Sequence, residues 1–229
     1  MFLDFIFKMR LQIHSDIHLE RYPCRRVRPI VSRLVLAGDI GVPVFPSYRE
    51  FFRDTSRQFD SIIYVLGNHE YERAWMGIDK NNYSLLEEKF IERNNLIRNI
   101  LSEFNNITLL DNNSMMIGKW KVFGATLWTN YHQRRSERKL SSVERFITEK
   151  HFETMGKIQS KQIDLLITHF VSDRSVLKKK WNIGLGSKTV IPAKKRVFGH
   201  IHYPICGDGT ICNPWGEEES QKEMIVDLD

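Results

Sequence analysis

Five short apolar segments recur along the chain, and each ends in residues that can bind a metal ion. The segments are rich in Val, Ile and Leu, which is typical of buried β-strands. A sheet whose strand ends meet at one place is therefore the simplest fold for such a chain. The five ends read Asp16-Ile17-His18, Gly38-Asp39, Gly67-Asn68-His69-Glu70, Thr168-His169 and Gly199-His200-Ile201-His202.

Strand geometry brings these polar ends together. Side chains two residues apart on an extended segment point the same way, so His200 and His202 face one spot. In α/β sheets, ligands collect outside the carboxyl ends of the strands. A single His-x-His pair is more often two ordinary histidines, whereas five such ends in one chain indicate a shared site. Two Asp, one Asn and several His suit a pair of divalent first-row ions.

The ordered series D-x-H, G-D, G-N-H-E, T-H and G-H-x-H resembles the calcineurin-like metallophosphoesterases. It runs from residue 16 to residue 202 and covers most of the chain. Three stretches of sequence resemble the small, stand-alone bacterial-type and viral-type members: Gln12 to Glu20, the segment 124–128 and Cys212-Asn213-Pro214. The resemblance implies a four-layer αββα sandwich of two mixed sheets flanked by helices. The residues alone predict only an α/β or α+β fold.

The resemblance also implies two metal sites and a catalytic histidine. Manganese is the expected metal, with iron, zinc, nickel or magnesium as alternatives. A hydroxide shared by the two ions would attack the phosphorus, and His69 would protonate the leaving oxygen or bind the phosphate. The family's ligands match these positions: Asp16, His18 and His202 for one ion, Asn68, His169 and His200 for the other, and Asp39 as the bridge between them.

The chain departs from the family pattern at two places near the site. Several branches carry an Asp shortly after Gly-Asp that orients the catalytic histidine, but residues 40–43 contain none. Glu70 could take this part. Many relatives carry a second histidine after Thr-His, whereas this chain has Phe170. We expect Phe170 and Tyr203 to contact the substrate, because aromatic rings suit a base or a second ester group.

These observations predict an enzyme, a metal-dependent phosphoric ester hydrolase that cleaves a phosphodiester in a small, nucleotide-like molecule. A phosphomonoesterase or a nuclease would use the same ligands. Basic clusters such as Lys178-Lys179-Lys180 would also suit nucleic acid, although such runs are more often solvated surface. A metal-free, protein-binding scaffold on the same fold is a further alternative, but such scaffolds lose ligands that this chain keeps. The oligomeric state is left open.

Composition favours one soluble domain over residues 1–229. With 41% hydrophobic and 27% charged residues the chain can bury a core of ordinary size, and its net charge of +6 favours an anionic partner. Three cysteines without C-x-x-C spacing indicate a reducing, cytoplasmic environment. The first residues lack the features of a signal peptide, and Met9 is an alternative start. No run approaches the roughly 18 apolar residues that cross a membrane.

Periodicity predicts the other elements. Apolar residues recurring at three and four predict an amphipathic helix over 82–103, capped by Asn82 or Ser84. A hairpin over 115–124 turns at Gly118-Lys119 and, with a strand just before it, would open a second sheet. The remaining expected elements are a helix over 48–59, that strand at 107–110, exposed helices within 129–160, a substrate loop at 172–192, a hairpin at 205–212 and a final strand at 224–228.

Overall fold

The structure is a computed structural model, which describes residues 9–76, 78, 82–133, 140–158, 162–172, 175, 177, 190–207, 209–215 and 224–228. The arginine-containing segment 134–139, the predicted basic cluster at 178–180, most of the predicted substrate loop and Asp208 of the tail hairpin lie outside these residues. No helix in the described part combines the length and the apolar character needed to span a membrane.

The first sheet contains five of the described strands, in the order β11-β1-β2-β3-β4. Strands β1 to β4 run parallel, and β11 pairs antiparallel with β1 at the edge. Helix α1 connects β2 to β3, which is the crossover that parallel neighbours require. The strands are β1 Met9–His14, β2 Arg33–Ala37, β3 Ser61–Val65, β4 Ile107–Leu109 and β11 Ile225–Leu228.

The second sheet contains six of the described strands, in the order β5-β6-β7-β8-β10-β9. The four inner strands run parallel, and β5 and β9 are antiparallel edges that belong to the two predicted hairpins. Gly118 turns the first hairpin with φ +56°. The prediction that β4 opens this sheet is wrong, because α2 returns the chain to the edge of β3 and β4 pairs there. The strands are β5 Asn113–Ile117, β6 Trp120–Ala125, β7 Leu165–Thr168, β8 Lys195–Phe198, β9 Ile205–Gly207 and β10 Thr210–Cys212.

The helices begin where the sequence provides suitable first residues. Helix α1 spans Pro46–Ser56 and carries its proline in the first turn, where no backbone N–H is needed. Helix α2 spans Tyr83–Leu101, and the side chain of Asn82 accepts a hydrogen bond from the Leu85 N–H at 3.0 Å, as expected of the predicted cap. The other helical segments are α3 Ser142–Ile158 and the short 3₁₀ turns η1 His69–Tyr71 and η2 Tyr131–Gln133.

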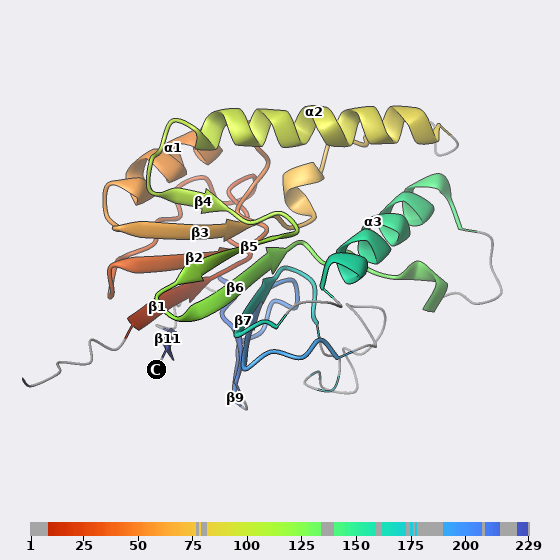
Figure 1. The fold of residues 1–229 in the computed structure, drawn as a ribbon. Coiled ribbons are helices and arrows are strands. Elements are labelled where there is room, and N and C mark those ends of the chain that lie inside the picture. The colour runs from red at the N-terminus through yellow and green to blue at the C-terminus, as the bar shows by residue number, and fades with distance from the viewer. Residues whose placement is uncertain are drawn as a thin grey trace, which may run out of the picture.

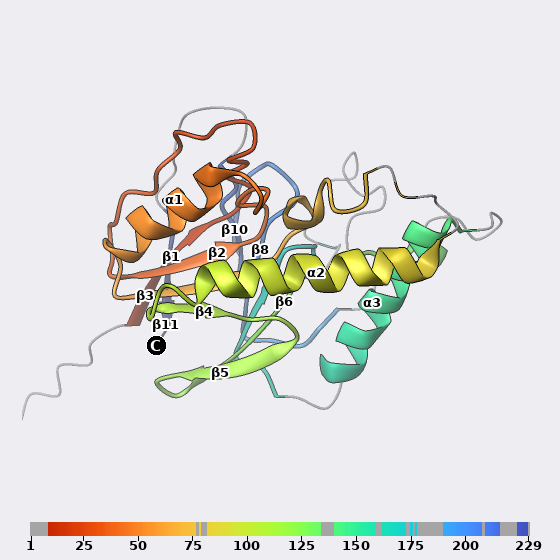
Figure 2. The same ribbon diagram turned by 90° about the horizontal axis from the view of Figure 1, so that it is seen from above.

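Successive side chains of each strand point to opposite faces of its sheet, so each sheet packs against the other sheet on one face and against helices on the other. Leu34 and Leu36 of β2 pack in one cluster with apolar side chains of α1 and α2, whereas Val35 and Ala37 pack against the second sheet. The outer face of the second sheet packs against α3. Figure 1 shows α2 above the first sheet and α3 beside the second, and Figure 2 shows α1 and α2 from above. The four-layer αββα sandwich is confirmed.

Parallel strands of both sheets end at one rim of the sandwich. Backbone hydrogen bonds tie the loops together there, since the Asp16 N–H donates to Gly38 O at 2.9 Å and the Gly199 N–H donates to His169 O at 3.1 Å. These bonds satisfy backbone groups that leave the sheet at the strand ends. The polar ends identified in the sequence therefore meet in three dimensions.

Candidate metal centre

The loops at this rim hold five of the candidate ligands in an unusual backbone conformation. Non-glycine residues avoid the left-handed region, since each residue there costs on the order of 1 kcal/mol or more. Such strain persists only where the surroundings enforce it, and it gathers at functional sites. The φ angles lie between 51° and 70° at Asp16, His18, Asp39, His200 and His202.

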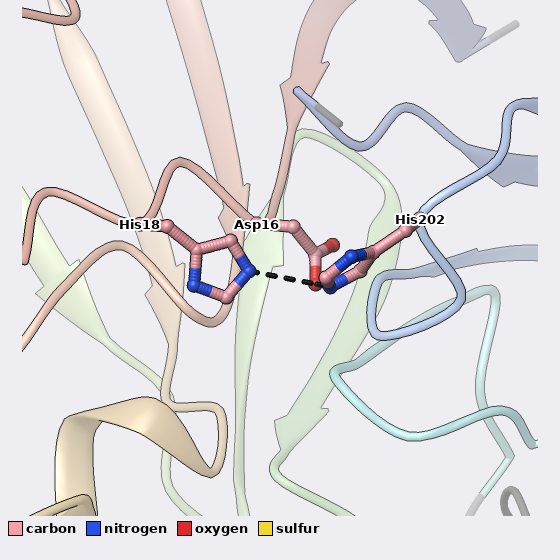
Figure 3. A group of neighbouring side chains, drawn as sticks. All are labelled: Asp16, His18 and His202. Carbon is pink, nitrogen blue, oxygen red and sulfur yellow. Dashed lines mark hydrogen bonds and ion pairs between the residues drawn. The ribbon is translucent and has the colours of Figure 1, made fainter. Parts of the chain in front are cut away.

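The first group of ligand atoms belongs to Asp16, His18 and His202 (Figure 3). His202 Nε2 lies 3.2 Å from His18 Nε2 and 3.3 Å from Asp16 Oδ1. Asp16 is fully buried, and its Oδ2 accepts a hydrogen bond from the backbone N–H of His200 at 3.0 Å. Burial is the largest influence and favours the neutral acid, but the hydrogen bond to His202 and the charge of His169 together lower the pKa of Asp16. An ionised carboxylate therefore faces two imidazole nitrogens.

The second group belongs to Asp39, His169 and His200. His169 Nδ1 donates to Ala37 O at 2.9 Å, so its Nε2 faces Asp39 Oδ2 and Asn68 Oδ1, each 3.1 Å away. His169 Nε2, Asp39 Oδ2 and Asn68 Oδ1 can all act as acceptors, so this close contact is unfavourable unless a proton or a cation lies between them. Burial opposes a charged imidazole, yet the Asp39 carboxylate raises the pKa of His169 to about 9. The position therefore attracts positive charge.

Two glycines allow the loops to approach this closely. Gly38 has φ +85°, and a Cβ atom there would collide with the ring of His169. A Cβ atom on Gly67 would collide with the carboxylate of Asp39, whose Oδ1 accepts a hydrogen bond from the His69 N–H at 2.7 Å. The glycines of the Gly-Asp and Gly-Asn motifs are therefore required by contact between loops.

His69 stands beside the second group and is held from behind. Its Nε2 lies 4.0 Å from Asp39 Oδ2, and its Nδ1 lies 2.9 Å from both Glu20 Oε1 and Glu72 Oε2. Burial lowers the pKa of His69, but the hydrogen bond to Glu20 and the charge of Asp39 raise it to about 9. Sequence reasoning missed both glutamates. The available signal was a carboxylate two residues after His18.

Glu70 does not orient His69, contrary to the role suggested for it from the sequence. Its carboxylate is fully buried and accepts four hydrogen bonds from other groups. The donors are the backbone N–H groups of Asp39 at 3.1 Å, Ile40 at 2.7 Å and Gly67 at 2.7 Å, and the Tyr64 hydroxyl at 2.6 Å. Glu70 instead joins the loop after β2 to the loop after β3, because a carboxylate can accept several N–H bonds at once.

The two predicted substrate contacts lie in packed surroundings. Phe170 is only 7% exposed, and its ring lies 4.2 Å from the ring of His200 and 5.9 Å from that of Trp128, centroid to centroid. This burial favours a packing role beneath His200 over the predicted contact with a base. Tyr203 is partly buried beside a cluster that contains Phe198, and its contact with substrate stays a prediction.

The donor atoms suit divalent cations. Each of the two groups combines one carboxylate with two imidazoles, and the ligand atoms within a group lie within 4.8 Å of one another. Carboxylate oxygen and imidazole nitrogen are ligands for manganese, iron and zinc. Asn68 adjoins the second group through its contact with His169. All the ligand positions predicted from the sequence are thus brought together at this rim.

Comparison with solved structures agrees with this arrangement at the level of the fold. The structure is similar to the crystal structure of phosphopantetheinyl hydrolase (PptH) from Mycobacterium tuberculosis, with a TM-score of 0.61 and 16% sequence identity. The match covers 91% of this chain and 89% of that chain. The chain has the fold of the calcineurin-like metallophosphoesterases. At 16% identity this similarity shows the fold alone, and the metal ligands stay a prediction from the sequence motifs.

A sequence relative of this metallophosphoesterase-fold chain is an uncharacterised protein of Acanthamoeba polyphaga mimivirus. The two are 30% identical over an alignment of 149 residues, and the match covers 58% of this chain and 49% of the viral protein. The match thus extends over about half the length of that relative. No protein-family model matches the sequence.

Proposed function

We propose that this chain is a metal-dependent phosphoester hydrolase with two divalent ions. The observation that carries the proposal is the pair of ligand groups at one rim, each with one carboxylate and two imidazoles. Two divalent ions beside two carboxylates leave a net charge of about +2, which attracts an anionic phosphate group. The metallophosphoesterase fold supports the same reading.

The proposed ligands follow the two groups. Asp39 is the proposed bridge, because only a carboxylate offers two oxygens that can serve two ions. Manganese is the proposed metal, since mixed oxygen and nitrogen donors suit it. The proposed sets are Asp16, His18 and His202 for one ion, and Asn68, His169 and His200 for the other.

The chain's own contribution to catalysis is to place charge and a proton donor around the phosphate. When bound, the ions would neutralise the phosphate charge and lower the pKa of the attacking water. His69 is anchored through Nδ1, so its Nε2 is turned toward Asp39 and the site. This placement suits protonation of the leaving oxygen, which is the usual contribution of a general acid.

The substrate proposed is a small phosphodiester of nucleotide-like character. A monoester carries nearly two negative charges and three free oxygens, so it needs additional cationic donors. Two arginines near these motifs lie against aromatic rings, with Arg25 3.7 Å above Tyr22 and Arg73 4.6 Å above Phe45, whereas Arg21 is exposed. This arrangement favours a diester, whose single charge needs less compensation.

A hydrolysis panel tests the proposed function. Bis-p-nitrophenyl phosphate, p-nitrophenyl phosphate, cyclic mononucleotides and single-stranded RNA and DNA would each be assayed with Mn²⁺, Mg²⁺, Zn²⁺ and Ni²⁺. We expect the diester to be cleaved with a higher kcat/KM than the monoester. Asp39→Asn should abolish turnover and remove at least one ion per chain, measured by elemental analysis.

Four outcomes would contradict parts of this proposal. If no substrate were hydrolysed with any of the metals, the proposal that this chain is an enzyme would be overturned. A preference of tenfold or more for the monoester would overturn the diester assignment. Cleavage of nucleic acid alone would identify a nuclease instead. A near-normal rate with two bound ions in Asp39→Asn would defeat the bridging role.

A further inference from the structure

One carboxylate lies behind two of the site's histidines. Glu20 Oε1 is 2.9 Å from His18 Nδ1 and 2.9 Å from His69 Nδ1. The two rings meet edge to face, with their centroids 4.4 Å apart. Because an ionised carboxylate only accepts hydrogen bonds, both imidazoles donate an Nδ1 proton to the same oxygen.

This shared contact decides which nitrogen each histidine presents to the site. With Nδ1 engaged, His18 turns Nε2 toward His202 at 3.2 Å, within the first ligand group. His69 turns Nε2 toward Asp39 Oδ2 at 4.0 Å, beside the second group. A carboxylate behind a ligating imidazole fixes its tautomer and orientation in this way. Here one carboxylate serves a metal ligand and a proposed proton donor together.

The second carboxylate oxygen of Glu20, Oε2, indicates that stability alone does not explain the position of this side chain. Oε2 is buried and has no hydrogen-bond partner among the described residues. A buried, unpaired acceptor costs about 1–3 kcal/mol. The turn after β1 nevertheless keeps Glu20 in place, since the N–H groups of Arg21 and Tyr22 both donate to His18 O at 2.9 Å. The backbone turn and the two histidine partners together set the position of Glu20.

We propose that Glu20 is a positioning residue that couples the first metal site to the proton donor, by holding His18 and His69 through one oxygen atom. The proposal rests on the proposed function for its catalytic half. Its structural half, the orientation of two imidazoles, does not depend on which ester is cleaved.

Metal affinity tests the contact with His18. Mn²⁺ would be titrated into chelator-treated protein by calorimetry, with Glu20→Ala, Glu20→Gln and Glu72→Gln compared with the natural sequence. We expect Glu20→Ala to weaken the affinity of one site by about 10- to 100-fold, the usual effect of removing such a partner. Glu20→Gln should recover part of this loss, because its amide oxygen can still accept.

Glu72→Gln is the matched control for metal affinity. Glu72 Oε2 contacts His69 Nδ1 at 2.9 Å, but its side chain is 47% exposed. It belongs to neither ligand group nor to the group of His18, Glu20 and His69. Its substitution should therefore leave the affinity for Mn²⁺ within about twofold, as expected for an exposed charge. Unchanged affinity in Glu20→Ala, or an equal loss in Glu72→Gln, would overturn the proposal.

A double-mutant cycle tests the contact with His69. At saturating Mn²⁺ and with a poor leaving group, Glu20→Ala should lower kcat by roughly tenfold or more, while melting curves verify folding. The same substitution in a His69→Ala background should lower kcat by less than about twofold, because the group it orients is already gone. An equal fold loss in both backgrounds would show that Glu20 does not act through His69.

A measurement on the metal-free protein separates this proposal from the proposed function. If the natural protein cleaved no ester, the proposed function would fail, yet histidine ¹⁵N NMR would still report the tautomers. The spectra would be recorded well above pH 9, where a pKa of about 9 leaves the His69 ring neutral. We expect Nδ1–H signals from His18 and His69 that are both lost in Glu20→Ala. Signals that persist in the variant, or Nε2–H tautomers in the natural protein, would overturn the positioning role.

Discussion

Replacing Glu70 by Gln should destabilise the protein through a local conflict between hydrogen-bond donors. The carboxylate is fully buried and receives two bonds on each oxygen. Oε1 accepts from the Ile40 N–H and the Tyr64 hydroxyl, and Oε2 accepts from the N–H groups of Asp39 and Gly67. A glutamine side chain keeps the shape but turns one of these acceptors into an NH₂ donor.

The size of the effect follows from the two ways in which the amide can lie. With NH₂ at the Oε2 position, two backbone N–H groups lose their acceptor. With NH₂ at the Oε1 position only the Ile40 N–H does, because the Tyr64 hydroxyl can rotate to accept and Tyr48 Oη lies 3.0 Å from it. One unpaired buried N–H costs about 1–3 kcal/mol, and the surviving bonds weaken by roughly half without the charge.

An opposing contribution reduces this cost. Burial and the nearby Asp39 carboxylate raise the pKa of Glu70, so a neutral side chain relieves some unfavourable electrostatic energy. Four donors aimed at the carboxylate outweigh this relief, since an amide cannot satisfy all of them. We expect a net loss of about 2 kcal/mol in the free energy of unfolding. For a chain of this length that corresponds to roughly 4–8 °C in Tm.

Urea unfolding of chelator-treated protein, followed by circular dichroism, would measure this loss. Tyr64→Phe is the matched control, because it removes one hydroxyl and leaves all three N–H groups their acceptor, at a cost of about 1 kcal/mol. Glu72→Gln, on a half-exposed side chain, should stay within about 0.5 kcal/mol. A Glu70→Gln protein as stable as the natural one would refute the argument that Glu70 joins the two loops.

Three further predictions concern other residues. His69→Ala should keep its metals and slow turnover by about 10²-fold on a poor leaving group but less on p-nitrophenyl esters, and equal losses would indicate phosphate binding instead. Gly67→Ala should lower the free energy of unfolding by about 2 kcal/mol or more and reduce metal content, because its Cβ would collide with Asp39. Gly156→Ala in α3 is the control, since its Cβ meets nothing within 4 Å, and it should stabilise the protein by about 0.5–1 kcal/mol. Burial lowers the pKa of His14 from 6.5 to about 4, so the unfolded chain binds this proton more tightly than the folded chain does. The free energy of unfolding should therefore fall by about 3 kcal/mol from pH 7 to pH 4. Acid unfolding would measure this dependence on pH, and His14→Gln should remove it.

The strand ends could be predicted because their signals are local. Continuous apolar runs define β2 and β3, and the polar residues directly after them must lie at the same rim when the strands are parallel. The Asn82 cap and the length of α2 also follow from neighbouring residues. These features need no knowledge of distant contacts, and the resemblance to metallophosphoesterases added the ligand order.

The partners of the histidines could not be predicted, because they depend on backbone turns that the sequence does not announce. Glu20 reaches His69 only because His18 adopts a φ of +55° and the chain folds back on itself. Glu70 sits next to His69 in sequence, yet η1 points its side chain into the core. Phe170 follows a ligand but lies beneath His200. Beyond the strand end, the regular alternation of side chains no longer predicts the direction in which a residue points.

The hydrogen bonds of the buried Glu70 carboxylate help to offset the backbone strain of the ligand loops. Several left-handed residues at about 1–3 kcal/mol each approach the net stability of a whole domain, which is about 5–15 kcal/mol. The apolar core cannot hold an individual loop in such a conformation, because burial is not directional. Hydrogen bonds are directional, and Glu70 fixes the Asp39 and Gly67 N–H groups on a single oxygen. Substitutions in these polar loop contacts, more than in the core, should therefore decide whether the ligands stay in register for a metal ion.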